Sequence, residues 1–132
     1  MKNKMSKSEQ EWKQTLTDKE YRVLRQKGTD PPFSGEYVHQ KGNGIYVCAA
    51  CGNELFSSEV KYDSGSGWPS FWEPLSEENV ELKSDASHGM RRVEVVCSRC
   101  GGHLGHVFDD GPQPTGKRFC INSTSVRFQK KE

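Results

Sequence analysis

The sequence has no long hydrophobic run. Hydrophobic residues make up 32% of its 132 residues, and the longest unbroken run of them covers only Ile45 to Cys51. A membrane-spanning helix needs about 20 apolar residues, so we expect no transmembrane helix and no membrane partner. The charged N-terminus is not followed by an apolar stretch, which argues against a secretory signal. We therefore expect a cytoplasmic protein.

An excess of charge of either sign is also missing, since 19 Lys and Arg against 18 Asp and Glu leave a net charge of +1. Non-specific nucleic-acid binding depends on neutralising many phosphates, so nucleic acid is not an expected partner. The 10% aromatic content and five cysteines do not fit a disordered tail. The length predicts a single domain over residues 1–132, which we expect to be a monomer.

So small a domain with so few apolar residues usually needs disulfides or a metal for stability. Four of the five cysteines form two Cys-x-x-Cys pairs, each followed by glycine: Cys48, Cys51, Cys97 and Cys100. In a reducing compartment such pairs predict a metal site before disulfides or a redox pair. Four thiolates without a histidine make a closed, structural site, for which we favour one zinc per chain. Iron also accepts this ligand set, which leaves rubredoxin-like electron transfer as an alternative.

The first 30 residues are predicted to be helical and separate in character from the rest. Ser8–Glu11 and Thr17–Glu20 both fit the capping box, in which a hydroxyl and a glutamate three residues later cap a helix start. Gly28 is a suitable end for the second helix. Pro31 and Pro32 then require extended chain. We expect two short helices that pack as a flap on the main body.

From Gly35 onward the pattern changes to short β-type segments. Residues 45–48, 93–97 and 126–128 are rich in β-branched or aromatic residues and are bounded by turn-forming residues. No segment after residue 33 has the apolar stripe of a helix. The sequence therefore predicts a mainly β, mostly antiparallel domain over about residues 31–128 with a helical extension over about residues 1–30.

The fifth cysteine, Cys120, lies in a short segment that alternates in polarity. If the segment is a strand, Arg118, Cys120 and Asn122 share one face, while Phe119 and Ile121 share the other. A neighbouring guanidinium favours the thiolate, which is the nucleophilic form of cysteine. The alternative is an inert cysteine on a half-buried strand.

Two histidines follow the second cysteine pair closely. His103 and His106, with Asp110 soon after, are candidates for a general acid or for a further metal ligand. His39 and His88 have no such neighbours, and we expect them to be structural or surface residues.

An aromatic cluster around a proline completes the candidate site. Trp68 emerges from a Gly-Ser-Gly turn and is a candidate wall for a small apolar pocket. Phe71 and Trp72 fit core packing, which is the usual role of such residues.

Several independent motifs together resemble the methionine sulfoxide reductase B family. They cover residues 62–71, 87–90, 103–112 and 118–122, along with the two cysteine pairs, and the likeness runs from about Gly28 to Phe128. The resemblance implies a β-tent-like fold of two small antiparallel sheets held together by a four-cysteine metal site. It also implies reduction of the R epimer of methionine sulfoxide in peptides and proteins.

The resemblance assigns roles to residues as well. Cys120 would be the nucleophile, and the four paired cysteines would hold a structural zinc. Trp68 would hold the S-methyl group of the substrate, with Phe71 as a second substrate-binding residue. The polar side of the site would comprise His103, His106, Asp110, Arg118 and Asn122.

One position departs from many members of the family, which carry a resolving cysteine where this sequence has Ser66. A serine hydroxyl cannot form a disulfide with a cysteine sulfenic acid. We therefore expect thioredoxin or another external thiol to recycle Cys120 directly. The rival from another class is a zinc-ribbon-like binding module with a redundant thiol.

Overall fold

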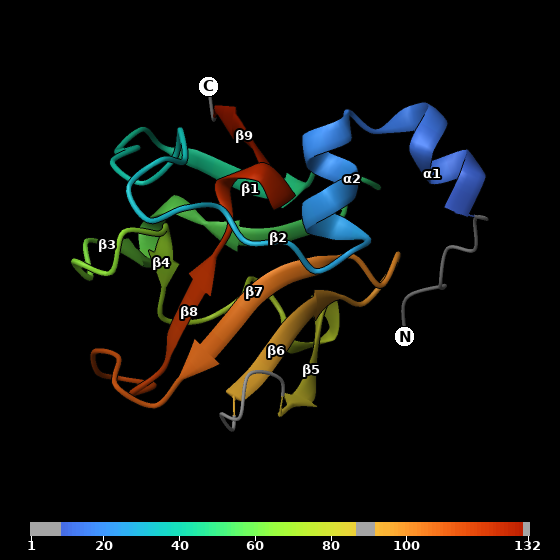
Figure 1. The fold of residues 1–132 in the computed structure, drawn as a ribbon. Helices are drawn as coiled ribbons and strands as arrows, with labels where there is room; N and C mark the ends of the chain where they lie inside the picture. The colour runs from blue at the N-terminus through green and yellow to red at the C-terminus, as the bar shows by residue number, and fades with distance from the viewer. Residues whose placement is uncertain (1–8, 87–91, 131–132) are drawn as a thin grey trace.

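The structure, a computed structural model, describes residues 9–86 and 92–130. Two short helices, α1 (Glu9–Thr15) and α2 (Asp18–Leu24), precede a body made of short strands (Figure 1). A three-stranded sheet has the order β2 (Glu54–Ser57), β1 (Gly44–Cys48), β9 (Val126–Lys130). A six-stranded sheet has the order β3 (Lys61–Tyr62), β4 (Ser70–Phe71), β8 (Arg118–Ile121), β7 (His103–Phe108), β6 (Arg92–Cys97), β5 (Val80–Asp85).

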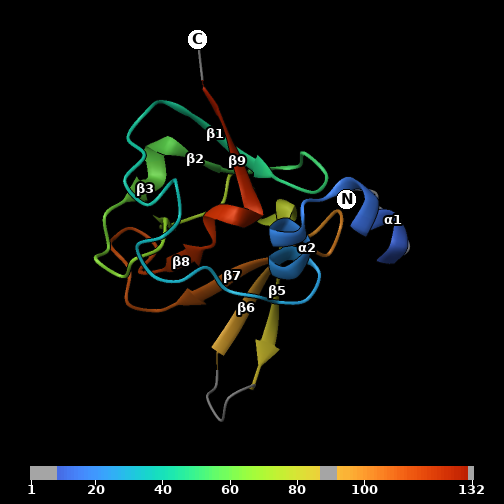
Figure 2. The same cartoon turned by 45° about the horizontal axis from the view of Figure 1, so that its top comes forward.

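Every pair of neighbouring strands is antiparallel. Strand β1 is the first strand of the chain and pairs both with β2, which follows it, and with β9, the last strand. Two sheets, mainly β content and two short N-terminal helices confirm the predicted fold class. Figure 2 shows the two sheets from a second direction, with α2 over one end of the six-stranded sheet.

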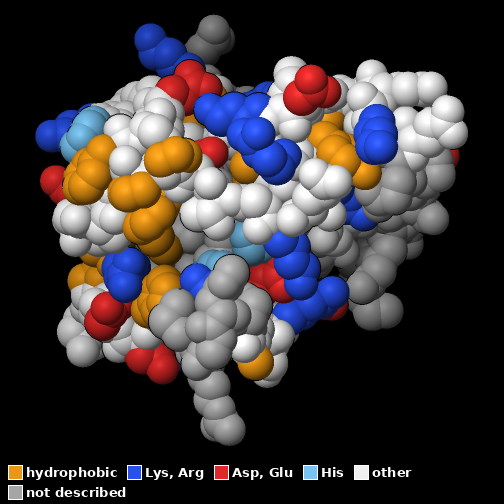
Figure 3. Space-filling model, viewed as in Figure 1, with side chains coloured by type: hydrophobic (Ala, Val, Ile, Leu, Met, Phe, Trp, Pro, Cys, Tyr) orange, Lys and Arg blue, Asp and Glu red, His pale blue; other side chains and the backbone are white. Residues whose placement is uncertain are grey.

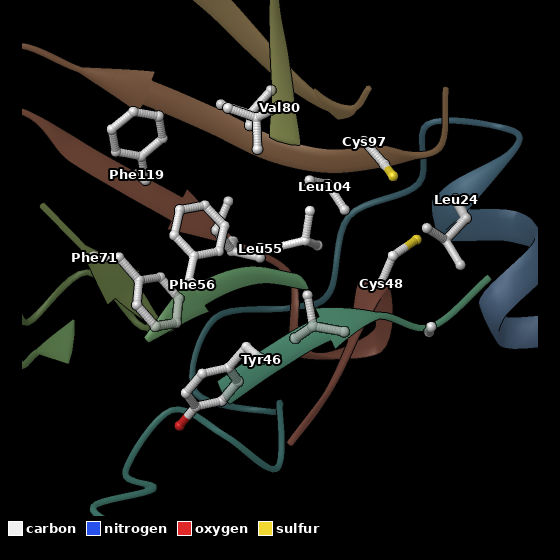
Figure 4. Close-up of a cluster of buried hydrophobic side chains, with 14 of the residues drawn as sticks. Leu24, Tyr46, Cys48, Leu55, Phe56, Phe71, Val80, Cys97, Leu104 and Phe119 are labelled. Carbon is white, nitrogen blue, oxygen red and sulfur yellow. The ribbon is translucent and has the colours of Figure 1, made fainter. Parts of the chain in front are cut away.

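The hydrophobic core lies between the sheets, where side chains from both point toward one another (Figure 4). Tyr46 and Phe56 from the smaller sheet meet Phe71 and Phe119 from the larger one. The rings of Phe56 and Phe71 stack with their centroids 4.5 Å apart. This contact fixes β4, and with it the turn that carries the candidate aromatic wall, against the core.

The second helix starts as predicted and ends earlier than predicted. The Thr17 hydroxyl accepts a hydrogen bond from the Glu20 backbone N–H, and the Glu20 carboxylate accepts one from the Thr17 N–H. The helix ends at Leu24 rather than at Gly28, and Lys27 rather than Gly28 has a positive φ. The capping box at Ser8 lies outside the described residues.

Both helices pack on the body, as expected of a flap. Trp12 and Leu16 from α1 and its following turn, and Leu24 from α2, belong to the buried core cluster. After residue 24, the helices of the described chain are all single-turn 3-10 helices. No helix in the described ranges is both long and apolar enough to cross a membrane. Strand β7, which carries both candidate histidines, was not predicted as a strand.

Candidate active site

A cavity of about 290 Å³ opens on one face of the six-stranded sheet. Figure 3 shows a hollow at the centre of that face, in which histidine side chains are visible. Half of the residues that line the cavity were predicted from the sequence, namely Trp68, His106, Arg118, Cys120 and Asn122. The others are Thr29, Ser66, Arg92, Gly105 and Phe108. The predicted residues His103, Asp110 and Phe71 do not line it.

The candidate nucleophile belongs to a row of polar residues that crosses the whole sheet. Directly opposed residues on antiparallel strands point their side chains to the same face, about 4.5–5.5 Å apart at Cβ. Cys120 lies opposite His106 on one side and opposite Ser70 on the other. From one sheet edge to the other the row is Tyr62, Ser70, Cys120, His106, Glu94 and Lys83.

Cys120 is partly buried, and the burial pattern of β8 follows the predicted alternation. Arg118 and Cys120 are half-buried, while Phe119 and Ile121 are buried in the core. The Sγ atom of Cys120 lies 3.6 Å from the Ser66 hydroxyl oxygen. Burial raises the pKa of the Cys120 thiol above its ordinary value, and contacts with Ser66 and Arg118 oppose that effect.

Arg118 lowers the pKa of the Cys120 thiol, as expected, but burial outweighs it. Its Nε and Nη2 atoms donate to the Asp110 carboxylate at 2.8 and 3.1 Å. Its guanidinium also lies 4.5 Å from the centre of the Phe108 ring. The exposed Asp110 therefore fixes Arg118 without itself reaching the cavity, and Arg118 in turn holds the pKa of the Asp110 carboxyl below its usual range.

His106 reaches the cavity with its ring held from behind. Its Nε2 atom lies 2.8 Å from the Asp85 carboxylate, which also lies 3.5 Å from Arg92 Nη2. A carboxylate at one ring nitrogen fixes the tautomer and orientation of a histidine. Sequence reasoning missed Asp85 and Arg92, because the pairing of β5 with β6 and of β6 with β7 is not visible in the sequence.

His103 is buried behind His106 and does not reach the cavity. Its Nδ1 atom lies 2.7 Å from the buried Glu94 carboxylate, and the two histidine rings lie 5.4 Å apart in an edge-on contact. Burial lowers the pKa of His103, and the Glu94 carboxylate only partly opposes this. Lys27 approaches the same carboxylate at 3.3 Å from the surface. His103 therefore packs against His106 from outside the lining of the cavity.

Asn122 and Trp68 are held in place by one short segment before the double proline. The Asp30 backbone N–H donates to Asn122 Oδ1 at 3.0 Å, and the Asp30 carbonyl accepts from Trp68 Nε1 at 2.8 Å. Asn122 Nδ2 also donates to the Leu104 carbonyl. The Asp30 carboxylate accepts two hydrogen bonds from Thr124. The only sequence signal for this anchor was an aspartate before two prolines.

Two other predicted residues lie away from the cavity. Phe71 has no exposed surface and stacks on Phe56, so it occupies the core, the position that its aromatic packing favours. That position does not bring it against a molecule in the cavity. His39 is exposed on the loop before β1, as expected. His88 and the motif at residues 87–90 lie outside the described residues.

The four paired cysteines meet between the two sheets. Their sulfur atoms all lie within 4.8 Å of one another, with Cys48 and Cys100 3.6 Å apart and Cys51 and Cys97 3.5 Å apart. A tetrahedron with metal–sulfur bonds of about 2.3 Å has edges of about 3.8 Å. A disulfide would need about 2.05 Å, and all five cysteines are free. The cluster therefore fits a metal ion better than the alternatives based on disulfides.

The backbone around the cysteines fits the same role. Cys48 ends β1 and Cys97 ends β6, so a bound ion ties the smaller sheet to the larger one. Gly52 and Gly101, which follow the pairs, both have positive φ and close their turns by hydrogen bonds to the first cysteine of each pair. Asn53 also directs its side-chain amide to Cys97 Sγ at 3.6 Å.

Comparison with known proteins gives a consistent result. A family model described as the SelR domain matches residues 16–130. The chain is 61% identical over 130 residues to the peptide methionine sulfoxide reductase MsrB of Methanosarcina mazei, covering 98% of this chain and 93% of the relative.

Two further relatives carry the same description. The MsrB protein of Hahella chejuensis is 60% identical over 126 residues, covering 96% of this chain and 91% of its own. The MsrB protein of Leptospira interrogans is 57% identical over 130 residues, covering 98% of this chain and 99% of its own. The chain therefore belongs to the SelR-domain family, together with the peptide methionine sulfoxide reductases MsrB.

Proposed function

We propose that the protein reduces the R epimer of methionine sulfoxide in peptides and proteins to methionine, with Cys120 as the nucleophile. The observation that carries the proposal is the pairing of Cys120 with His106 across β7 and β8, inside a cavity walled by Trp68. Family membership and relatives described as peptide methionine sulfoxide reductases support it.

The first step joins the thiolate of Cys120 to the electrophilic sulfur of the sulfoxide. Its S–O bond breaks only when the oxygen receives a proton, because oxide is a poor leaving group. We assign proton delivery to His106 in its doubly protonated form, through the Nδ1–H, because Nε2 is turned to the Asp85 carboxylate. His106 lines the cavity opposite Cys120, whereas His103 is buried and does not line it. The protonated oxygen then passes to Cys120 Sγ as the transient bond between the two sulfur atoms breaks. The substrate sulfur thereby gains two electrons and leaves as the thioether, and Cys120 is oxidised to the sulfenic acid.

The geometry also supports a choice between epimers. The sulfoxide sulfur is pyramidal, so three fixed contacts distinguish its two configurations. Trp68 offers an apolar face for the S-methyl group, and its indole is held by the hydrogen bond to the Asp30 carbonyl. His106 offers a donor for the oxygen, and Cys120 approaches the sulfur. Asn122 is a positioning residue, because its side-chain bonds already join Asp30 to Leu104.

Recycling must come from outside the chain. Ser66 lies 3.6 Å from Cys120 Sγ, at the position of the resolving cysteine in many relatives, and its hydroxyl cannot form a disulfide. The other four thiols are gathered at the metal cluster. An external thiol therefore attacks the sulfenic acid, releases water and forms a mixed disulfide, which a second thiol reduces. Thioredoxin or a small dithiol supplies both electrons.

We assign zinc to the four-cysteine site, where it serves structure, since four thiolates leave no open position for a substrate. Cysteines bind a metal only while they are reduced, and the cytoplasm keeps thiols reduced, so we assign the protein to the cytoplasm. The cavity that contains Cys120 is lined by residues of one chain, so the proposed reaction needs no second copy, and we take the protein to act as a monomer.

Turnover of the two separate epimers tests the proposed function. Wild-type protein with dithiothreitol should reduce a blocked methionine R-sulfoxide and leave the S epimer unreacted. Cys120→Ser should reduce neither epimer. Equal reduction of both epimers, or activity of Cys120→Ser comparable to wild type, would refute the assignment.

A further inference from the structure

Phe33 is the most exposed of the large hydrophobic side chains in the described residues, with 64% of its surface accessible. It follows Pro31 and Pro32, which are also exposed, so three successive apolar residues are accessible to solvent. We call residues 31–33 the Pro-Pro-Phe patch. Figure 3 shows hydrophobic side chains gathered on the same face as the central hollow.

The backbone holds Phe33 in this exposed position at a conformational cost. Phe33 has φ of 63°, a left-handed conformation that is unfavourable for a residue with a bulky side chain. Its N–H donates to the Gly67 carbonyl at 2.7 Å, and the Ser34 hydroxyl donates to the Pro31 carbonyl at 2.6 Å. Such strained residues persist only where their surroundings fix them, and they concentrate at functional sites.

The patch lies at the rim of the cavity. A Cβ atom added to Gly67 would meet the Phe33 ring at 3.1 Å and the Pro32 side chain at 2.7 Å. The residues on either side of Gly67 are Ser66 and Trp68, and both line the cavity. The ring of Phe33 therefore lies against the same turn that places Ser66 next to the reacting sulfur.

We propose that the Pro-Pro-Phe patch binds an apolar side chain of the substrate polypeptide close in sequence to the oxidised methionine. This inference rests on the proposed function. An extended chain advances about 3.3–3.6 Å per residue, so a side chain within about three positions of the methionine can reach the rim. The patch makes the enzyme prefer methionine sulfoxide in an apolar sequence context, as in core segments exposed by unfolding.

The chemistry of the patch favours this occupant. Methionine is an apolar core residue. Residues two positions away on a strand, or three positions away on a helix, face the same side, so buried apolar residues often lie a few positions from it. Two prolines and a fixed ring lose little conformational freedom on binding, which makes a contact with them effective for its size. Because the patch adjoins the cavity, it also fixes how the substrate peptide is aligned. The oxidised side chain enters beside Trp68 while the neighbouring residue lies on Phe33.

The test compares two blocked peptides that contain one methionine R-sulfoxide. In the first, the flanking residues on each side are leucine and serine in alternation, and in the second they are glycine and serine. Dithiothreitol is the reductant, so that docking of a protein reductant does not enter the rate. The quantity measured is the ratio of kcat/KM for the leucine peptide to kcat/KM for the glycine peptide.

Three variants distinguish the effect of losing the Phe33 ring from a general effect on folding. Phe33→Asn removes the ring and tolerates the left-handed backbone, while Phe33→Tyr keeps an aromatic ring. Leu82→Thr removes another exposed apolar side chain, on β5, which does not line the cavity. We expect Phe33→Asn to lower the ratio on the order of fivefold, mainly through KM for the leucine peptide, because the apolar contact with the ring is lost. Phe33→Tyr and Leu82→Thr should keep the wild-type ratio.

The outcomes are distinct. An unchanged ratio in a folded Phe33→Asn, shown by an unchanged melting temperature, overturns the inference. A raised KM for thioredoxin in that variant, with the peptide ratio unchanged, also overturns it and assigns the patch to the reductant. Failure of the wild-type protein to reduce either peptide refutes the proposed function itself.

Discussion

His106 and Cys120 lie directly opposite each other on the neighbouring antiparallel strands β7 and β8. Their side chains therefore emerge on the same face of the sheet, and both line the cavity. The Asp85 carboxylate holds His106 at Nε2 from the far side. The proposed proton donor and the proposed nucleophile are thus positioned by strand pairing rather than by loops.

Replacing His106 by asparagine should lower kcat for methionine R-sulfoxide by about 10²–10⁴-fold, because the departing oxygen loses its proton donor. KM should change little, since Trp68 and the rim remain. Steady-state kinetics with dithiothreitol measure both constants. His39→Asn, an exposed histidine outside the cavity, is the matched control and should keep wild-type kinetics. A kcat for His106→Asn close to that of wild type would contradict the assignment.

Arg118 should control the pH at which the Cys120 thiol reacts. Burial raises the pKa of this thiol and Arg118 lowers it, so Arg118→Ala should move the pKa further upward. Because the thiolate is the reactive form, the rate of iodoacetamide alkylation rises with pH through this pKa. The alkylation profile of Arg118→Ala should therefore shift to higher pH, and that of Arg118→Lys, which keeps the charge, should shift less. Coincident profiles for Arg118→Ala and wild type would disprove this role.

Ser66→Cys should convert the reaction to one with an internal disulfide. The Ser66 oxygen lies 3.6 Å from Cys120 Sγ, so a cysteine at this position brings a second sulfur to the sulfenic acid, and their condensation releases water. After a single turnover without added thiol, peptide mapping should find residues 66 and 120 cross-linked in the variant. The wild-type protein should contain no disulfide to Cys120. A cross-link from Cys120 to another cysteine of the wild-type chain would contradict the predicted recycling route.

The four-cysteine cluster should hold one zinc per chain and should be required for folding. Cys97→Ser removes one ligand from the cluster that joins β1 to β6, so the melting temperature should fall sharply and the metal content should drop. Cys120 lies outside the cluster, so Cys120→Ser should keep the wild-type melting temperature and metal content. Elemental analysis and thermal denaturation provide the measurements. A red, iron-containing protein would instead support the rubredoxin-like alternative.

The metal site and the face of β8 could be predicted because their signals are local. Two Cys-x-x-Cys pairs specify a ligand set whatever strands carry them, and alternation along residues 118–121 indicated the correct buried and exposed sides. The capping box at Thr17 was equally local. The early end of α2 was missed, since Arg25 and Lys27 leave the helix to reach the Cys100 carbonyl and Glu94, which are distant in sequence.

The supporting residues could not be predicted, because strand pairing brings them to the site. Asp85 reaches His106 through the register of β5, β6 and β7, and no short sequence pattern encodes that register. Asp30 holds both Trp68 and Asn122 through its backbone, and an aspartate before two prolines does not indicate which distant residues it will bind. The polarity of His103 suggested a place in the cavity, whereas its ring is buried against Glu94.

The most direct test is a single turnover in the absence of any thiol. Reduced protein is mixed with an equimolar peptide containing methionine R-sulfoxide and is then examined by mass spectrometry after dimedone trapping. We predict one methionine formed per chain and one sulfenic acid formed at Cys120, which dimedone converts to a thioether adduct of that residue alone with release of water. Methionine formed without an adduct at Cys120, or no methionine formed until a thiol is added, would contradict nucleophilic attack by this cysteine.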